Sequence, residues 1–93
     1  MNINFDRLVV DQEPHYIMFT SEPYVVQLKT GFVVAADLII QKTKKEKTLL
    51  LGAQSLSLPL FERMANNKNK LTGIEVWIYK KGSERTSKYI VED

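Results

Sequence analysis

Cysteine is absent from this 93-residue chain, and histidine occurs only once, at position 15. Disulfides and thiolate metal sites are therefore excluded, and His15 has no second histidine with which to share a metal ion. The four glycines stand far apart, so they cannot form a loop that cradles phosphate groups. No serine has a base at a spacing that identifies a nucleophile. We therefore expect no catalytic site, no metal and no cofactor, and we do not expect an enzyme.

Long apolar runs are missing as well. None approaches about 18 residues, the length that indicates a transmembrane helix. Acids at positions 6, 11 and 13 make the first residues unlike a signal peptide, which begins with basic residues. The composition, 44% hydrophobic and 26% charged, is ordinary for one soluble globular domain. We expect a cytoplasmic protein without a membrane partner.

The clearest strand covers residues 71–79, LTGIEVWIY. Side chains alternate along a strand, so one face carries aliphatic residues that suit the core: Ile74, Val76 and Ile78. The other face carries the only tryptophan of the chain: Glu75, Trp77 and Tyr79. This second face runs directly into Lys80 and Lys81. It is either a second packing surface or a platform for a ligand, and we favour the platform.

Further segments have the β-branched and aromatic composition of strands. They are residues 24–29, 32–40, 49–51 and 87–91. Residues 15–19, HYIMF, lie between Pro14 and Pro23 and predict one more short strand. We place this strand in an N-terminal extension, residues 1–22, which could supply an extra strand or a dimer contact. Residues 23–93 are predicted to form the domain itself.

One helix is predicted at about residues 57–66. Ser57 and Pro59 suit the first turn, where a proline is tolerated. Leu60, Phe61 and Met64 then form an apolar stripe. The polar run NNKNK at residues 66–70 ends the helix.

The expected order is strand, strand, strand, helix, strand, strand, which is the layout of an OB-fold. The matching positions are an early glycine at Gly31, a "G-x-x-V-x-I-x-x-x-G" stretch from Gly73 to Gly82, and a closing "Y-x-V" at Tyr89 and Val91. Over residues 24–92 the chain resembles the small OB-fold, single-stranded DNA-binding-like proteins of bacteriophages and mobile elements. The resemblance implies a mainly β domain, a five-stranded Greek-key barrel with its helix between strands three and four. A small SH3-like or other mixed β-barrel is the alternative.

Charge is distributed unevenly along the chain. Residues 1–40 carry a balance of −3, whereas residues 41–90 carry +7. Ten of the thirteen basic residues fall in three short polar segments: residues 42–47, 68–70 and 80–88. If the fold gathers these segments on one side, the resulting basic face would attract a polyanion.

Stacking faces and a basic groove are what single-stranded nucleic acid requires. We therefore predict that the chain binds single-stranded nucleic acid, most simply DNA, with Trp77 and Tyr79 as the stacking platform. Phe32, Tyr24 and Tyr89 are further stacking candidates. The phosphates would be held by lysines and an arginine from two connections: Lys42, Lys44, Lys45, Lys47, Lys80, Lys81, Arg85 and Lys88. The resemblance implies that the second connection forms one wall of the cleft.

A protein-interaction module is the rival hypothesis, because OB and related barrels are reused for many tasks. In that case the chain would be a small phage or plasmid factor that binds a host protein or forms part of an assembly, including a homodimer. Trp77 and Tyr79 would then be an interface hot spot, and Arg85 an anchor.

Overall fold

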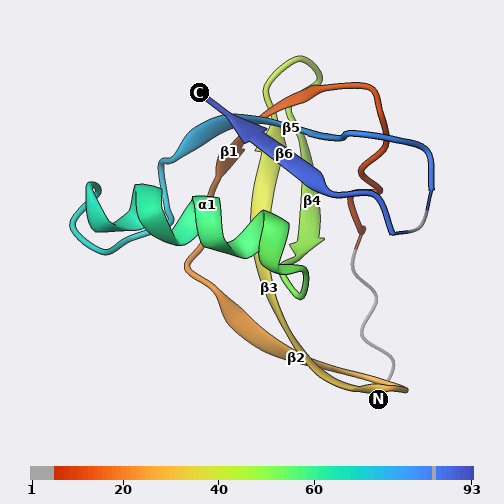
Figure 1. The fold of residues 1–93 in the computed structure, drawn as a ribbon. Coiled ribbons are helices and arrows are strands. Elements are labelled where there is room, and N and C mark those ends of the chain that lie inside the picture. The colour runs from red at the N-terminus through yellow and green to blue at the C-terminus, as the bar shows by residue number, and fades with distance from the viewer. Residues whose placement is uncertain (1–5, 85) are drawn as a thin grey trace.

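The computed structural model describes residues 6–84 and 86–93, which form one antiparallel sheet and one helix (Figure 1). The elements are β1 (His15–Phe19), β2 (Tyr24–Leu28), β3 (Gly31–Ile40), β4 (Lys45–Leu50), α1 (Gln54–Ala65), β5 (Glu75–Lys80) and β6 (Tyr89–Glu92). The domain is therefore mainly β, as predicted. The strand order is β2-β3-β1-β5-β6, with β4 on the second side of β3, and the sheet does not close. Within the described residues, no helix has the length and apolar character that spanning a membrane requires.

Strand β3 is the longest strand and pairs with three others. Strands β1 and β2 lie end to end along β3, with Phe19 opposite Leu38 and Tyr24 opposite Ala35. Strand β4 pairs with the second half of β3, where Leu49 is opposite Ala36. The second half of β3 is therefore flanked by strands on both sides.

Strand β1 lies inside the sheet, between β3 and β5. Within residues 6–84 and 86–93 the sheet accordingly has six strands instead of the five of the predicted barrel, because residues 15–19 of the predicted extension pair on both sides. Ile17 and Phe19 are completely buried, and the side chain of Met18, which lies between them, faces the other way. Burial of these two residues makes β1 a central part of the core.

The core consists of aliphatic residues from every layer, together with Phe19. Strand β5 contributes Val76 and Ile78, both completely buried, as the alternation of residues 71–79 predicted. Leu8 and Val10 come from the N-terminal segment, residues 6–11. The amide of Leu8 donates to the carbonyl of Thr48 (2.8 Å), and the amide of Lys80 donates to the carbonyl of Asp11 (2.6 Å). This segment thereby connects β4 to the end of β5.

Helix α1 begins three residues earlier than predicted, at Gln54, and Pro59 lies inside it. We expected proline in the first turn because its ring removes a backbone donor within a helix. The apolar stripe is in fact Leu56, Leu60 and Met64, spaced four residues apart, and the first two are completely buried. Phe61, which we assigned to the stripe, is exposed.

Strand β4 is longer than the predicted segment 49–51, because residues 45–48 belong to it. The sequence KEKT suggested a solvated connection, but charged residues are common on strands at the margin of a sheet. Only residues 41–44 form the turn, and Lys44 adopts the left-handed conformation there, with φ at 58°.

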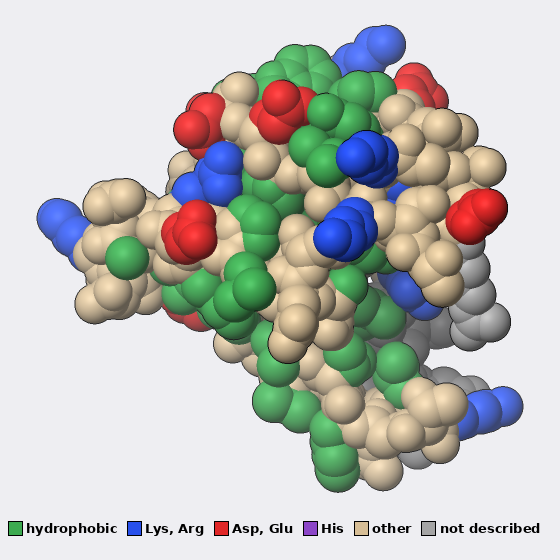
Figure 2. All heavy atoms as spheres, viewed as in Figure 1, with side chains coloured by type: hydrophobic (Ala, Val, Ile, Leu, Met, Phe, Trp, Pro, Cys, Tyr) green, Lys and Arg blue, Asp and Glu red, His purple; other side chains and the backbone are tan. Residues whose placement is uncertain are grey.

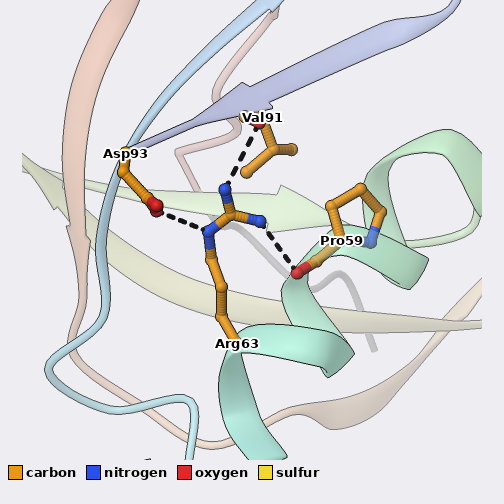
Figure 3. A network of polar contacts seen from close by, with 4 residues as sticks. All are labelled: Pro59, Arg63, Val91 and Asp93. Atoms are coloured by element: carbon orange, nitrogen blue, oxygen red, sulfur yellow. Dashed lines mark hydrogen bonds and ion pairs between the residues drawn. The ribbon is translucent and has the colours of Figure 1, made fainter. Parts of the chain in front are cut away.

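Arg63 fastens α1 to the last strand (Figure 3). Its Nε atom donates to Asp93 Oδ1 at 2.8 Å, and its terminal nitrogens donate to the carbonyls of Pro59 (3.0 Å) and Val91 (3.5 Å). The amide of Tyr89 donates to Ser55 Oγ at 3.1 Å. Both ends of β6 are thereby connected to the helix.

Glu22, in the turn between β1 and β2, also connects two segments that are distant in the sequence. Its carboxylate accepts hydrogen bonds from the amides of Leu71 and Thr72 and from the Thr72 hydroxyl. These bonds favour the charged form, the Thr72 hydroxyl most of all, and so they lower the pKa of Glu22 below its ordinary 4.5. The turn that joins the two strands is held to the segment before β5.

We predict that Phe19→Ala lowers the free energy of unfolding by about 3–5 kcal/mol, because it removes a large side chain from a closely packed core. Chemical denaturation followed by circular dichroism measures the change. Val9→Ala is the control, since Val9 is apolar but exposed, and we expect a change within about 0.5 kcal/mol. A loss below about 1 kcal/mol for Phe19→Ala would contradict the central place of β1.

The second prediction concerns acid stability. Because the pKa of Glu22 is lowered in the folded state, its contribution is present above pH 4.5 and is lost as the pH falls through the folded value. Glu22→Gln should lower stability at pH 7 and flatten the loss of stability on acidification. Melting temperatures between pH 7 and about pH 3 test this. Glu62→Gln, an exposed carboxylate on α1, is the control and should leave the profile unchanged.

Candidate nucleic-acid interface

Trp77 lies on the outer face of the sheet, where 43% of its surface is exposed. The residue opposite Trp77 on β1 is Tyr16, and the two ring centres are 5.0 Å apart with the planes tilted by 45°. Tyr79 follows on the same face of β5 and is partly buried. We call these three residues the aromatic row. It exists because Val76 and Ile78 occupy the core face of the same strand.

A chain of hydrogen bonds connects the aromatic row to the β3–β4 turn. The Tyr16 hydroxyl donates to Glu75 Oε2 (3.2 Å), and Gln41 Nε2 donates to Glu75 Oε1 (2.9 Å). Lys44 Nζ in turn donates to Gln41 Oε1 at 2.7 Å. One predicted phosphate-binding residue, Lys44, is therefore anchored beside the row.

Carboxylates, rather than lysines, are the immediate neighbours of Trp77. Glu75 is two residues away on the same face of β5, and Glu92 lies directly opposite Trp77 on β6. Glu92 accepts a hydrogen bond from the Tyr79 hydroxyl. The row thus combines the exposed ring of Trp77 and two half-buried tyrosine rings with two negative charges.

Both carboxylates act on the neighbouring tyrosines. Burial, followed by the charge of Glu75, raises the pKa of Tyr16 above its ordinary 10.0. The hydrogen bond to Glu92 raises the pKa of Tyr79 in the same direction. The two hydroxyls therefore remain protonated donors at neutral pH.

Of the lysines in residues 42–47, those of the turn lie nearest the row. Gln41 continues β3 beside Tyr16, where its amide donates to the Tyr16 carbonyl at 2.9 Å. Lys42 and Lys44 follow in the turn and are exposed. Lys45 and Lys47 lie on β4, and Lys47 Nζ is paired with Asp6 Oδ1 at 2.9 Å.

The lysines of the β5–β6 connection reach the same end of the sheet. Lys80 points to the opposite side of β5 from Trp77, with its Nζ atom 5.2 Å from the centre of the Tyr89 ring. Lys81 and Lys88 are exposed, and their backbones are joined by a hydrogen bond of 2.9 Å. Arg85, the remaining candidate of this connection, lies outside the described residues.

Residues 68–70 lie at the opposite end of the sheet, after α1 and beside Glu22. The three lysine segments are therefore not gathered at one place. On the face drawn in Figure 2, basic side chains stand apart from one another and form no single patch.

The further stacking candidates lie apart from the row. Phe32 is 75% exposed at the start of β3, nine residues or about 30 Å of extended strand from Gln41. The Tyr24 hydroxyl donates to Asp37 Oδ1, and Tyr89 packs against the core.

Asp37, the carboxylate within the apolar run of β3, has the partner that its burial requires. It accepts hydrogen bonds from Thr48 Oγ1 (2.8 Å) and from Tyr24. It also borders a hollow of about 280 Å³, whose lining is polar: Asp6, Thr20, Asp37, Glu46, Lys47 and Thr48. Among the described residues, no three His, Asp or Glu side chains come close enough to hold a metal ion.

Comparisons with protein-family models, with curated proteins and with solved structures found no match.

Tyr16 is the main residue of the row that sequence reasoning missed. The alternation of HYIMF already places Tyr16 and Met18 on the face opposite Ile17 and Phe19. Its position beside Trp77, however, depends on the pairing of β1 with β5, two segments about sixty residues apart. Periodicity within one strand carries no information about that partner.

We predict that Glu75→Gln lowers the pKa of Tyr16 toward 10.0, because the neighbouring negative charge is removed. The shift should be partial, since burial is its larger cause. The pKa of Tyr16 is higher in the folded state than in the unfolded state. The contribution of Tyr16 to stability is therefore present below pH 10.0 and is lost as the pH rises through the folded pKa. Alkaline NMR titration of the tyrosine ring carbons separates Tyr16 from the other tyrosines. Glu62→Gln is the matched control, and an unchanged Tyr16 titration in Glu75→Gln would contradict the coupling.

Proposed function

We propose that this chain binds single-stranded nucleic acid on the aromatic row, without catalysing a reaction. The observation that supports this best is the tilted pair of exposed Trp77 and half-buried Tyr16 at the end of the sheet to which two lysine-bearing connections lead. Base stacking on such rings is worth about 1–3 kcal/mol per base and depends little on sequence. DNA is the simplest ligand of this class.

An OB-like architecture is part of the proposal. Strands β1 and β2 both run antiparallel along β3, so they can be counted as one long strand with a break at residues 20–23. Counted in this way, the order becomes three strands, a helix and two strands, as in an OB-fold. The N-terminal segment then links β4 to the end of β5 through its hydrogen bonds to Thr48 and Lys80. The aromatic row lies on the first and fourth of these strands, rather than on the second and third, where OB-folds usually bind.

The charges suggest how a strand of nucleic acid would lie. Glu75 and Glu92 repel phosphates, so the backbone would follow the lysine end of the sheet and direct its bases onto the row. There, carboxylates can accept hydrogen bonds from exocyclic amino groups such as cytosine N4. Lys42, Lys44 and Lys81 would contact phosphates.

We predict that Trp77→Ala weakens the binding of oligo-dT by about 1–3 kcal/mol while the fold is retained. Fluorescence anisotropy of a labelled oligonucleotide measures the affinity, and oligo-dT should quench the tryptophan fluorescence of the unchanged protein. Phe61→Ala is the matched control, because it removes an exposed aromatic ring of α1, away from the row. Equal losses in the two variants, or no quenching, would contradict the proposal.

Salt dependence tests the lysines in the same assay. Each phosphate contact that is lost should reduce the slope of log K against log salt by about 0.7. Replacing Lys42 and Lys44 by glutamine should reduce the slope. Replacing Lys80 and Lys81 should also reduce it, and we expect that reduction to come from the loss of Lys81. Replacing Lys68 and Lys70, at the other end of the sheet, should not.

A second candidate, a protein-interaction module, is supported by the two carboxylates beside Trp77. Aromatic rings with neighbouring negative charges suit arginine or lysine side chains of a protein partner. A lysine- or arginine-rich peptide, rather than oligo-dT, would then quench Trp77. Glu75→Gln with Glu92→Gln would weaken this binding and would strengthen, or leave unchanged, binding to nucleic acid.

A further inference from the structure

Strand β2 lies at the margin of the sheet and, among the described residues, pairs only with β3. Its sequence, YVVQL, contains neither a charge nor a proline. Natural proteins usually protect such an edge with lysine, proline or a bulge, because unpaired backbone groups attract another strand. The other marginal strands are protected in this way, since β4 carries Lys45, Glu46 and Lys47 and β6 ends in Glu92.

The direction of the backbone groups on this edge follows from the hairpin. Leu28 and Gly31 pair across a two-residue turn, so they exchange hydrogen bonds with each other. Bonded and non-bonded pairs alternate, and hence Val25 and Gln27 direct their N–H and C=O groups away from β3. The carbonyl of Val34, opposite Val25, likewise turns away from β2 and accepts a hydrogen bond from the amide of Leu51 at 2.7 Å.

The side chains beside this edge are apolar and exposed. Val25 (63%), Phe32 (75%) and Val34 (37%) share one face, because Val25 is opposite Val34 and Gln27 is opposite Phe32. The hairpin projects from the body of the domain, and Figure 2 shows apolar side chains along it. A two-stranded ribbon is marginally stable in water by itself, and contiguous exposed apolar surface marks interaction sites.

We propose that β2 pairs antiparallel with β2 of a second copy of this chain, so that the sheet continues across a two-fold axis. With Val26 opposite its counterpart, Val25 of each chain stands opposite Gln27 of the other. Both pairs can then exchange hydrogen bonds, and the edge-facing groups of these residues in both chains are satisfied.

Charge and symmetry favour a second copy over an unrelated strand. Strand β2 carries no charge that would repel its counterpart. In this register Lys29 stands opposite Pro23 of the second copy, next to Glu22, so the cation nearest the edge meets a carboxylate. A surface that is complementary to itself is what a two-fold interface requires.

Analytical ultracentrifugation tests the interface. The unchanged chain should dimerise with increasing concentration, whereas Gln27→Pro, which removes one edge-facing donor, should remain monomeric. Phe32→Lys, on the adjoining face, should also remain monomeric. This variant replaces Gln27→Pro in the test if circular dichroism shows that Gln27→Pro does not fold. Val9→Lys is the matched control: Val9 is 74% exposed, lies away from β2, and should leave the dimer intact. A chain that stays monomeric up to ~1 mM, or a dimer that survives both β2 variants, would overturn the proposal.

The register can be tested separately, because the chain has no cysteine of its own. Val26→Cys should form an intermolecular disulfide on oxidation, since residues of a non-bonded antiparallel pair are about 4.5 Å apart at Cα, within the range of disulfides. Val25→Cys should not, because its neighbour in the second copy is Gln27. Non-reducing electrophoresis distinguishes the two. Faster cross-linking of Val25→Cys would overturn this register.

Discussion

The pairing of β1 with its two neighbours determines where every other feature lies. Ile17 and Phe19 must be buried, and Val76 and Ile78 must meet them from β5. Because side chains alternate, this requirement alone brings Tyr16 next to Trp77 on the opposite face. A shift of one residue in either strand would expose the core residues, so the same burial that stabilises the sheet also sets the geometry of the aromatic row.

The surroundings of the row modify what its rings can bind. Each tyrosine hydroxyl donates to a carboxylate, which keeps these charges next to the rings and holds the side chains in place. Lysines arrive from connections at the end of the sheet and not from the row itself. The ligand that we propose would therefore present its negative charge at that end and its apolar or hydrogen-bonding part at the row, as a nucleotide does with its phosphate and its base.

Local patterns along the chain were sufficient for much of the fold. The alternation in residues 71–79 and the apolar run of residues 32–40 predict β5 and β3, because burial on one or both faces leaves a signal within the strand itself. Local preference is misleading where a marginal strand is charged, as in β4, or where a helix contains a proline, as in α1. There the packing of the core determines the secondary structure. Leu56 and Leu60 determine where α1 lies, although Pro59 alone would move its start.

The candidate site was less predictable, for a physical reason. Trp77 and Tyr79 could be placed on the outer face from their own strand, but exposure depends on what the remaining chain covers. Tyr16 and Glu92 reach Trp77, and Gln41 reaches Tyr16 and Glu75, only through pairing between distant segments. The positions of the lysine segments could not be predicted for the same reason. Their sequence indicates three solvated connections, but only the topology of the sheet shows that residues 68–70 lie apart from the other two.

The two proposed surfaces are independent, because the hairpin of β2 and β3 and the aromatic row lie near opposite ends of β3, about 30 Å apart along the strand. A dimer joined through β2 would leave both rows free. Two rows on one particle could engage a single ligand strand at two points, and the second contact would then form at a high effective concentration. Loss of the β2 edge would therefore weaken binding to long strands more than to short ones, although no residue of the row is altered.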